Sequence, residues 1–195
     1  MLHVFLWKLC CMSKAFVIAL REEVNYIDHI HGSPIVFSGV GKINAALAAY
    51  ELISKGFTEI INIGSCGSKK YHLGDIIKVG RVYQDIDATP ISPYGLTPFE
   101  EESHFIELDP TSEHSCFTTD YFYDHLQLSK YSPSYIEMIN TCSVFDMELY
   151  GIAKTCKRFN VKLSAYKWVS DDGDFSKWAE NCEISSRHVI EMLAQ

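Results

Sequence analysis

The chain has 195 residues, of which 47% are hydrophobic and 22% are charged, close to the average of soluble globular domains. This composition excludes a disordered chain, a collagenous repeat and a coiled coil. A chain of this length folds as one domain with a full core. The 17 basic and 25 acidic residues give a net charge of −8, which argues against binding to nucleic acid or to an anionic membrane surface.

The first 20 residues are apolar but are interrupted by Lys8 and Lys14, and they lack a small-residue cleavage site. A second methionine, Met12, precedes the first clear strand. We expect the domain to cover residues 12–195 and residues 1–11 to be an N-terminal extension, with a targeting segment as the alternative. Seven scattered cysteines without a CxxC pair indicate reduced thiols in a cytoplasmic protein.

Buried strands and a helix alternate in the first third of the chain. Apolar runs predict strands over residues 15–20, 34–37 and 59–63. Helical spacing of apolar residues predicts a helix over 44–55 that ends at Gly56. The order strand, glycine turn, helix, strand and second glycine turn is typical of an α/β unit with a mostly parallel sheet.

The rest of the chain continues this alternation around a long proline-rich loop over residues 85–110, and loops of that length are usually functional or form an interface. We expect one α/β domain whose central sheet is mixed, mostly parallel and twisted, with helices on its flanks. The further predicted elements are a β segment over 74–79 that runs towards 82–83, strands over 116–119, 143–145 and 161–169, and helices over 134–140, 147–160 and 176–193.

Polar residues follow most of the predicted strands. In open α/β sheets, ligands bind beyond the carboxyl ends of the strands, so these residues are candidates for one site. They are Glu22 and Glu23, Gly39 and Gly41, Ser65 and Gly67, Thr119 and Asp120, Asp146 and Glu148, and Ser170 and Asp171.

Four segments together resemble the nucleoside phosphorylase/nucleosidase superfamily, most closely its methylthioadenosine/S-adenosylhomocysteine nucleosidase branch. They are IALREEV (18–24), SGVGKINAALAAYELI (38–53) with INIGSCGS (61–68), FTTDYFY (117–123), and FDMELYGIAKTCKRFNV (145–161) with VSDDGD (169–174). The resemblance covers residues 15–175 in the family's order. It implies a phosphorylase/hydrolase-like three-layer sandwich and a purine nucleosidase.

The resemblance assigns two catalytic carboxyls. Asp171 falls where the family keeps the acid that protonates purine N7, and Glu23 falls where the nucleosidases keep the carboxylate that activates water. Cleavage of an N-glycosidic bond passes through an oxocarbenium-like sugar, so the leaving base needs a proton and the anomeric carbon needs a nucleophile. One carboxyl must therefore be protonated while the other is ionised, which two distinct environments achieve.

The resemblance also implies the residues that hold the substrate. Glu148 would accept hydrogen bonds from the ribose hydroxyls, Met147 would pack on the sugar, and Phe122 would stack on the purine. The backbone of Tyr123 would pair with the base edge. Ser65 and Gly67, with Cys66 between them, would form a glycine turn near the sugar, and Ser170 would complete the set beside the acid.

The eight histidines show no metal spacing, so we expect no metal and no cofactor.

The candidate site residues and their neighbours also have purely structural interpretations. The structural alternatives are an acidic helical turn for Glu22 and Glu23, N-caps for Asp146, Asp171 and Asp172, a helix-start carboxylate for Glu148, a core aromatic for Phe122, and a buried thiol for Cys66.

Hydrolysis is favoured over phosphorolysis. Purine and uridine phosphorylases of this superfamily carry an Arg two residues before the glycine turn and another in an early loop, whereas this chain has Asn62 and the run ALREE (19–23). Phosphorolysis remains the alternative because Arg21 could swing towards the site. A non-catalytic nucleoside-binding protein on the same fold is the second alternative.

A small purine nucleoside is the expected partner, because only a purine offers N7 to Asp171. The loop 85–110 resembles a family segment that reaches a neighbouring subunit and walls the 5′ pocket, so we expect a homodimer. Its apolar residues suit a thioether such as methylthioadenosine or S-adenosylhomocysteine, which would connect the enzyme with methionine salvage. Residues 24–38 are too few for the β-hairpin usual there in the family.

Overall fold

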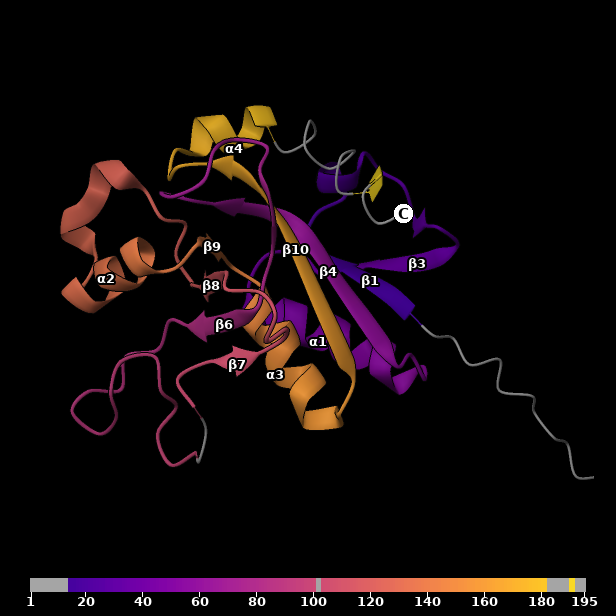
Figure 1. Ribbon diagram of the computed structural model, residues 1–195, viewed down its shortest axis with the longest axis horizontal. Helices are drawn as coiled ribbons and strands as arrows, with labels where there is room; N and C mark the ends of the chain where they lie inside the picture. Colours follow the sequence, from indigo (N-terminus) through magenta and orange to yellow (C-terminus); the bar gives the residue numbers. More distant parts are fainter. Residues whose placement is uncertain (1–13, 101–102, 182–189, 192–195) are drawn as a thin grey trace, which may run out of the picture.

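The computed structural model describes residues 14–100, 103–181 and 190–191. The expected domain start at Met12 and the extension of residues 1–11 lie outside the described residues, as do residues 182–189 and 192–193 of the predicted last helix. Figure 1 shows the central strands crossing the molecule, with α1 and α3 along one side and α4 at the end of β10.

The elements follow the predicted alternation closely. In chain order they are β1 (Lys14–Ile18), the short 3₁₀ helix η1 (Glu22–Val24), β2 (His29–Ile30), β3 (Ser33–Phe37), α1 (Lys42–Ser54), β4 (Glu59–Gly67), β5 (Ile76–Lys78), β6 (Arg81–Gln84), β7 (Ile106–Glu107), β8 (Ser115–Thr118), the 3₁₀ segment η2 (His125–Lys130), α2 (Pro133–Thr141), β9 (Val144–Asp146), α3 (Leu149–Phe159), β10 (Lys162–Asp171) and α4 (Phe175–Asn181).

The strands of the described residues form one sheet in the order β2-β3-β1-β4-β9-β8-β6-β7, and β10 pairs with both β4 and β5. The pairs β1–β3, β1–β4, β4–β10, β6–β8 and β8–β9 are parallel. The pairs β2–β3, β5–β10, β6–β7 and the single bridge between β4 and β9 are antiparallel. The prediction of a mixed, mostly parallel sheet flanked by helices is therefore confirmed.

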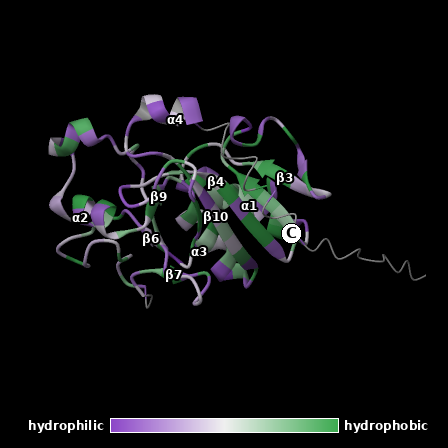
Figure 2. Ribbon diagram, turned by 45° about the horizontal axis from the view of Figure 1, so that its top comes forward, coloured by the Kyte–Doolittle hydropathy of each residue, from purple (hydrophilic) through white to green (hydrophobic). Residues whose placement is uncertain are grey.

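The core occupies both faces of the sheet. On one face, α1 and α3 bury small and aliphatic side chains such as Ala45, Ala49 and Ile152 against the strands. On the other face, Phe16, Ile63 and Trp168 form a second cluster. Figure 2 shows hydrophobic residues concentrated on β3 and the central strands. Burial on both faces explains why these strands read as continuous apolar runs.

The predicted glycine turn at residues 64–68 is wrong, because β4 continues through Gly67 in parallel register with β10 as far as Asp171. Only glycine fits at position 67, since a Cβ there would lie 2.0 Å from the ring of Phe145. The close approach of β9 to β4 therefore explains this glycine, and Ser65 and Cys66 are strand residues.

Three short elements were not predicted. The two-residue strand β2 pairs with β3, so residues 24–38 do hold a small hairpin. The strand β7 lies inside the predicted loop 85–110, where it pairs with β6. The segment η2 follows β8 and begins with an Asp124 side-chain cap on Leu126. Elements of two to six residues carry too few side chains for a periodic pattern to mark them.

Candidate active site

A cavity of about 320 Å³ opens beyond the carboxyl ends of the parallel strands, a size within the usual range for small-molecule sites. Its lining comes from segments that are far apart in the chain and meet at this edge of the sheet. The lining residues are Ala19, Leu20, Glu23, Val40, Ser65, Cys66, Gly67, Thr119, Tyr121, Phe122, Tyr123, Phe145, Asp146, Met147, Glu148, Asp171 and Trp178.

Glu23 lies at the end of the cavity that β1 and β4 form. The chain leaves β1 and bends into η1, which turns this side chain inward so that it is buried. Its Oε1 accepts hydrogen bonds from the backbone N of Ser65 at 2.8 Å and from Ser65 Oγ at 2.6 Å. Its Oε2 accepts one from the backbone N of Leu20 at 3.1 Å. Donors on both oxygens hold this carboxylate in a fixed orientation at the cavity wall.

Asp171 is the last residue of β10 and is also buried. Its Oδ1 accepts a hydrogen bond from the backbone N of Gly173 at 2.8 Å, and its Oδ2 accepts one from Ser170 Oγ at 2.9 Å. Burial raises the pKa of this carboxyl, and the two hydrogen bonds offset only part of that effect. A raised pKa suits a proton donor near neutral pH.

Glu148 lies between β9 and α3, where its carboxylate faces the cavity. Its Oε1 accepts a hydrogen bond from the backbone N of Gly41 at 3.0 Å, and its Oε2 accepts one from the backbone N of Met147 at 3.3 Å. Burial raises the pKa of Glu148, and the nearby Asp146 carboxylate raises it further. The glycine segment after β3 thus positions this carboxylate.

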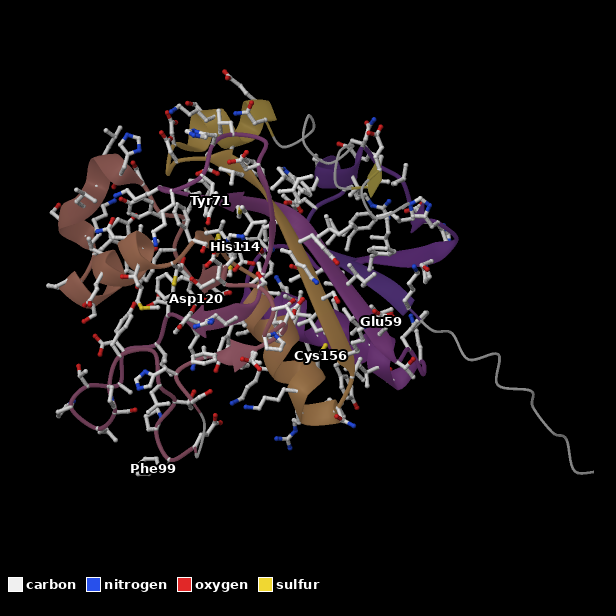
Figure 3. The ribbon with its side chains drawn as sticks, in the orientation of Figure 1. Glu59, Tyr71, Phe99, His114, Asp120 and Cys156 are labelled. Atoms are coloured by element: carbon white, nitrogen blue, oxygen red, sulfur yellow. The ribbon has the colours of Figure 1, made fainter. Side chains whose placement is uncertain are left out.

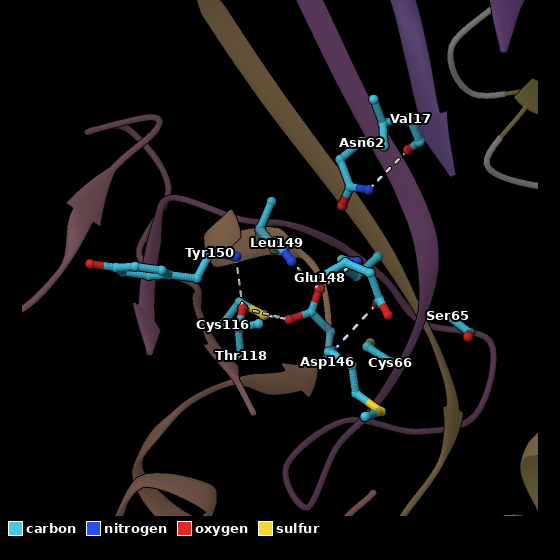
Figure 4. Close-up of polar contacts among 12 residues, drawn as sticks. Val17, Asn62, Ser65, Cys66, Cys116, Thr118, Asp146, Glu148, Leu149 and Tyr150 are labelled. Carbon is cyan, nitrogen blue, oxygen red and sulfur yellow. Dashed lines mark hydrogen bonds and ion pairs between the residues drawn. The ribbon is translucent and has the colours of Figure 1, made fainter. Parts of the chain in front are cut away.

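Below these carboxylates, Lys167 and Asp146 form a buried ion pair. The Lys167 Nζ and Asp146 Oδ2 atoms are 2.8 Å apart, and both side chains are 1% exposed. Asp146 Oδ1 also accepts from Thr118 Oγ1 at 2.6 Å, and Oδ2 accepts from the backbone N of Leu149 at 2.9 Å (Figure 4). Asp146 thus accepts from the first residue of α3, but Glu148 occupies the N-cap position of that helix. The interpretation of Asp146 as a simple cap is therefore wrong, since the residue also pairs with Lys167 and reaches the cavity wall.

Aromatic rings form the wall opposite Glu23. Phe122 lies on the cavity with 39% of its surface exposed, so the core interpretation of this residue is wrong. Tyr123 is buried, and its ring packs against Phe145 and Tyr131. A half-exposed ring beside an apolar pocket can stack on a flat heterocycle.

All but one of the predicted site residues line this cavity. Ser170 is the exception, because its side chain is fully buried behind the wall and reaches Asp171 instead.

The capping interpretation fails for Asp171 and Asp172. The cap of α4 is Asp174, which accepts from the backbone N of Ser176, while Asp172 pairs with Lys177.

Cys66 is a buried thiol, as the structural interpretation had it. Its Sγ donates to the backbone O of Trp168, and burial raises the pKa of the thiol well above its usual value.

Within the described ranges, no group of three or more His, Cys, Asp or Glu side chains is arranged to hold a metal ion. In the same part of the chain, no helix is long and apolar enough to cross a membrane.

Sequence reasoning missed Lys167 and Trp178. Lys167 carried a signal, because a lone lysine within the otherwise buried strand 161–169 needs a buried counter-ion. Trp178 carried none, because its contact with the cavity depends on how α4 packs against the end of β10. Its Nε1 donates to Ser65 Oγ at 3.0 Å.

Paired carboxyls in an enclosed pocket at the strand ends define an α/β protein built for acid–base chemistry on a small molecule. The sequence model of the Phosphorylase superfamily matches residues 25–195. The chain belongs to this superfamily, as its motifs had indicated.

Curated relatives carry a more specific name. The chain is 27% identical over 204 residues to a 5′-methylthioadenosine/S-adenosylhomocysteine nucleosidase of Staphylococcus saprophyticus, covering 91% of this chain and 88% of the relative. It is 30% identical over 186 residues to the enzyme of the same name from Staphylococcus aureus strain MRSA252, covering 82% and 79%.

Solved structures share the fold. The 5′-methylthioadenosine/S-adenosylhomocysteine nucleosidase of Helicobacter pylori, complexed with a substituted pyrrolidinol, aligns with a TM-score of 0.79 at 20% identity and covers 94% of this chain and 97% of its own. Futalosine hydrolase of the same organism aligns with a TM-score of 0.78, also at 20% identity, covering 94% and 96%.

Proposed function

We propose that the protein is a nucleosidase that hydrolyses the N-glycosidic bond of a purine nucleoside, with 5′-methylthioadenosine and S-adenosylhomocysteine as its first candidate substrates. The observation that carries this proposal is the placement of Glu23 and Asp171 on one cavity in unlike surroundings. Glu23 accepts three hydrogen bonds, whereas burial raises the pKa of Asp171. The names of the staphylococcal relatives support the same activity.

Asp171 acts as the general acid. Burial raises the pKa of its carboxyl and so favours the protonated form; as the bond from the anomeric carbon to N9 breaks, the proton of this form passes to N7 of the departing purine. The backbone N–H of Gly173 and the hydroxyl of Ser170 then stabilise the carboxylate that remains. Phe122 stacks on the base, and the backbone of Tyr123 pairs with its edge.

Glu23 acts as the general base. It takes a proton from water as the water oxygen bonds to the anomeric carbon, so the products are the free purine and the ribose moiety with a new hydroxyl. Glu148 accepts hydrogen bonds from the ribose hydroxyls, with Met147 against the sugar. Lys167 neutralises part of the negative charge that these carboxylates gather beneath the substrate.

Water is favoured over phosphate because no lysine or arginine is among the described residues that line the cavity, so these residues offer a phosphate dianion no cation. Four carboxyls line it, and Lys167 below them is paired with Asp146. Arg21, which the sequence had left open, forms an ion pair with Asp28 at 2.8 Å, and its guanidinium lies 4.4 Å from the ring centre of Phe37. Asn62 donates to Val17 O inside the sheet.

The test is release of free base from purified protein, with and without inorganic phosphate. The panel should contain 5′-methylthioadenosine, S-adenosylhomocysteine, adenosine, inosine, uridine and futalosine. We expect phosphate-independent release of adenine from the first two compounds and no cleavage of uridine. Strict dependence on phosphate would establish the phosphorylase alternative, and binding without turnover would establish the non-catalytic one.

We further propose that the protein is a homodimer in the cytoplasm. The α1 helix exposes an apolar stripe of Ile43, Leu47 and Tyr50 next to Val40, which also lines the cavity. The described part of loop 85–110 does not line the cavity of its own chain, and it exposes Phe99 at its tip (Figure 3). A second copy could cover both features, and the four described cysteines are free, as a reducing compartment requires.

The mass in solution, measured by light scattering after size exclusion, tests the dimer. We expect twice the chain mass for the wild type and a monomer for Leu47→Glu, because a charge cannot be buried without a partner in an apolar interface. Glu51→Gln on the same helix is the control, because it also changes the charge by one unit but replaces an already exposed ionic side chain, and it should leave the dimer intact. A wild-type monomer at micromolar concentration would refute the dimer.

A further inference from the structure

The α4 helix is joined to the ends of β4 and β10 by two side-chain hydrogen bonds. Trp178 Nε1 donates to Ser65 Oγ at 3.0 Å, and Asn181 Nδ2 donates to the backbone O of Ser170 at 3.1 Å. Ser65 in turn contacts Glu23, and Ser170 contacts Asp171. One short helix therefore contacts the neighbours of both proposed catalytic carboxyls.

The Trp178 bond fixes the direction in which the Ser65 hydroxyl points. An indole N–H can only donate, so Ser65 Oγ must be the acceptor in this contact. The single hydroxyl hydrogen of Ser65 is then free to point at Glu23 Oε1, which lies 2.6 Å away. The three residues form a chain of hydrogen bonds that runs from the indole through the hydroxyl to the carboxylate.

This chain leaves the two carboxylate oxygens of Glu23 unequal. Among the described residues, Oε1 accepts from both the backbone N and the hydroxyl of Ser65, whereas Oε2 accepts the single, longer bond from the backbone N of Leu20. The less occupied oxygen retains lone-pair capacity for a water molecule. Trp178 and Glu23 both line the cavity, so the chain lies along its wall.

We propose that Trp178 is a positioning residue for Glu23, acting through Ser65: its N–H orients the Ser65 hydroxyl towards Glu23 Oε1, which leaves Oε2 directed at the attacking water. The inference rests on the proposed function, in which Glu23 is the base. The inference adds Trp178 of α4 to the residues that act in catalysis. Trp178 is near the general acid Asp171 in the sequence, but it acts on the general base Glu23.

The consequence is a specific effect on the pH profile. Trp178→Phe keeps an aromatic ring on the cavity wall but removes the N–H, so the Ser65 hydroxyl can rotate away from Oε1. A carboxylate that loses a hydrogen bond is less stabilised in its ionised form. We expect the acidic limb of kcat/KM to move to higher pH and kcat at its optimum to fall about three- to tenfold, with KM changed less than twofold.

A double-mutant cycle separates this action from ordinary packing. We expect Trp178→Phe and Ser65→Ala each to lower kcat, and the double variant to be no worse than Ser65→Ala alone, because both changes interrupt one chain. Asn181→Ala is the matched control on α4, since its hydrogen bond does not reach Ser65. The factor by which Asn181→Ala lowers kcat should multiply with the factor for Ser65→Ala, because the two residues are not in one hydrogen-bond chain.

The outcomes distinguish the inference from the proposed function. If the wild type releases no base from any nucleoside, the proposed function fails. The role of Trp178 is overturned by either of two results with an active wild type. One is that the reductions in kcat for Trp178→Phe and Ser65→Ala multiply in the double variant, and the other is that Trp178→Phe leaves the acidic limb of kcat/KM in place. Should Ser65→Ala fold poorly, the pH profile of Trp178→Phe with an unchanged melting temperature decides alone.

Discussion

Lys167 and Asp146 form a buried ion pair beneath the cavity, with 2.8 Å between Nζ and Oδ2. A Cβ at Gly64 would lie 3.3 Å from Lys167 Nζ and 3.5 Å from Glu23 Oε1, so the ammonium and the proposed base approach the same point of β4. Despite burial, the Asp146 and Glu148 carboxylates raise the pKa of Lys167, and Lys167 helps to lower that of Asp146.

Removing one partner of this pair should strongly destabilise the protein. Lys167→Met leaves the Asp146 carboxylate buried without its counter-ion, and we expect a loss of about 3–5 kcal/mol in the free energy of unfolding, measured by urea denaturation. Lys162→Met on the same strand is the control, because its ion pair with Glu59 is exposed and should contribute less than about 1 kcal/mol. Equal losses for the two variants would contradict a buried charge pair.

The general acid can be tested with an isosteric change. Asp171→Asn keeps an oxygen for the Gly173 N–H but cannot deliver a proton, so we expect kcat to fall about 10²- to 10⁴-fold while the circular dichroism spectrum is unchanged. Asp172→Asn is the matched neighbour, since Asp172 is exposed and pairs with Lys177. Undiminished turnover in Asp171→Asn would refute the assignment.

Gly173 makes room for Tyr123. It has φ +98°, and a Cβ there would lie 2.6 Å from the Tyr123 ring. Gly173→Ala should push the ring and the Gly173 N–H away from Asp171, costing roughly 1–3 kcal/mol of stability and a measurable part of kcat.

The additional change Tyr123→Leu should restore part of the kcat lost in Gly173→Ala, since a smaller side chain clears the space. Gly32→Ala is the control, because Gly32 also has positive φ (+77°) but a Cβ added there would meet no heavy atom of the described residues within 4 Å, its chain neighbours apart. If Gly32→Ala lowers stability as much as Gly173→Ala, backbone strain alone explains the cost.

Glu148 should make the protein less stable as the pH rises. Its folded-state pKa lies above the ordinary value of about 4.3, so its contribution to stability is fully present below that pH and is lost as the pH rises through the raised pKa. Glu148→Gln removes this titration but keeps the acceptor for the Gly41 N–H.

Denaturation curves of both proteins between pH 4 and 9 measure the effect. The free energy of unfolding of the wild type should fall relative to that of Glu148→Gln with rising pH. Curves that remain parallel across this range would show that burial does not perturb Glu148.

Much of the fold was predictable because burial on both faces leaves a local signature. The strands at 15–20, 34–37 and 59–63 and the helix ending at Gly56 correspond to β1, β3, β4 and α1 within a few residues. The same pattern could not show that β4 continues through Gly67, because that extension depends on pairing with β10 and on the ring of Phe145.

By itself, the sequence determined the order of the elements and the carboxylates at the strand ends, because strand and helix periodicities and motif spacings are local properties of the chain. Only the tertiary structure decided the partners of those carboxylates. Lys167 pairs with Asp146, Ser65 reaches Glu23 across 42 positions, and Trp178 reaches Ser65 across 113. Such contacts form where strand ends and a returning helix meet, and no local pattern records which side chains will face each other there.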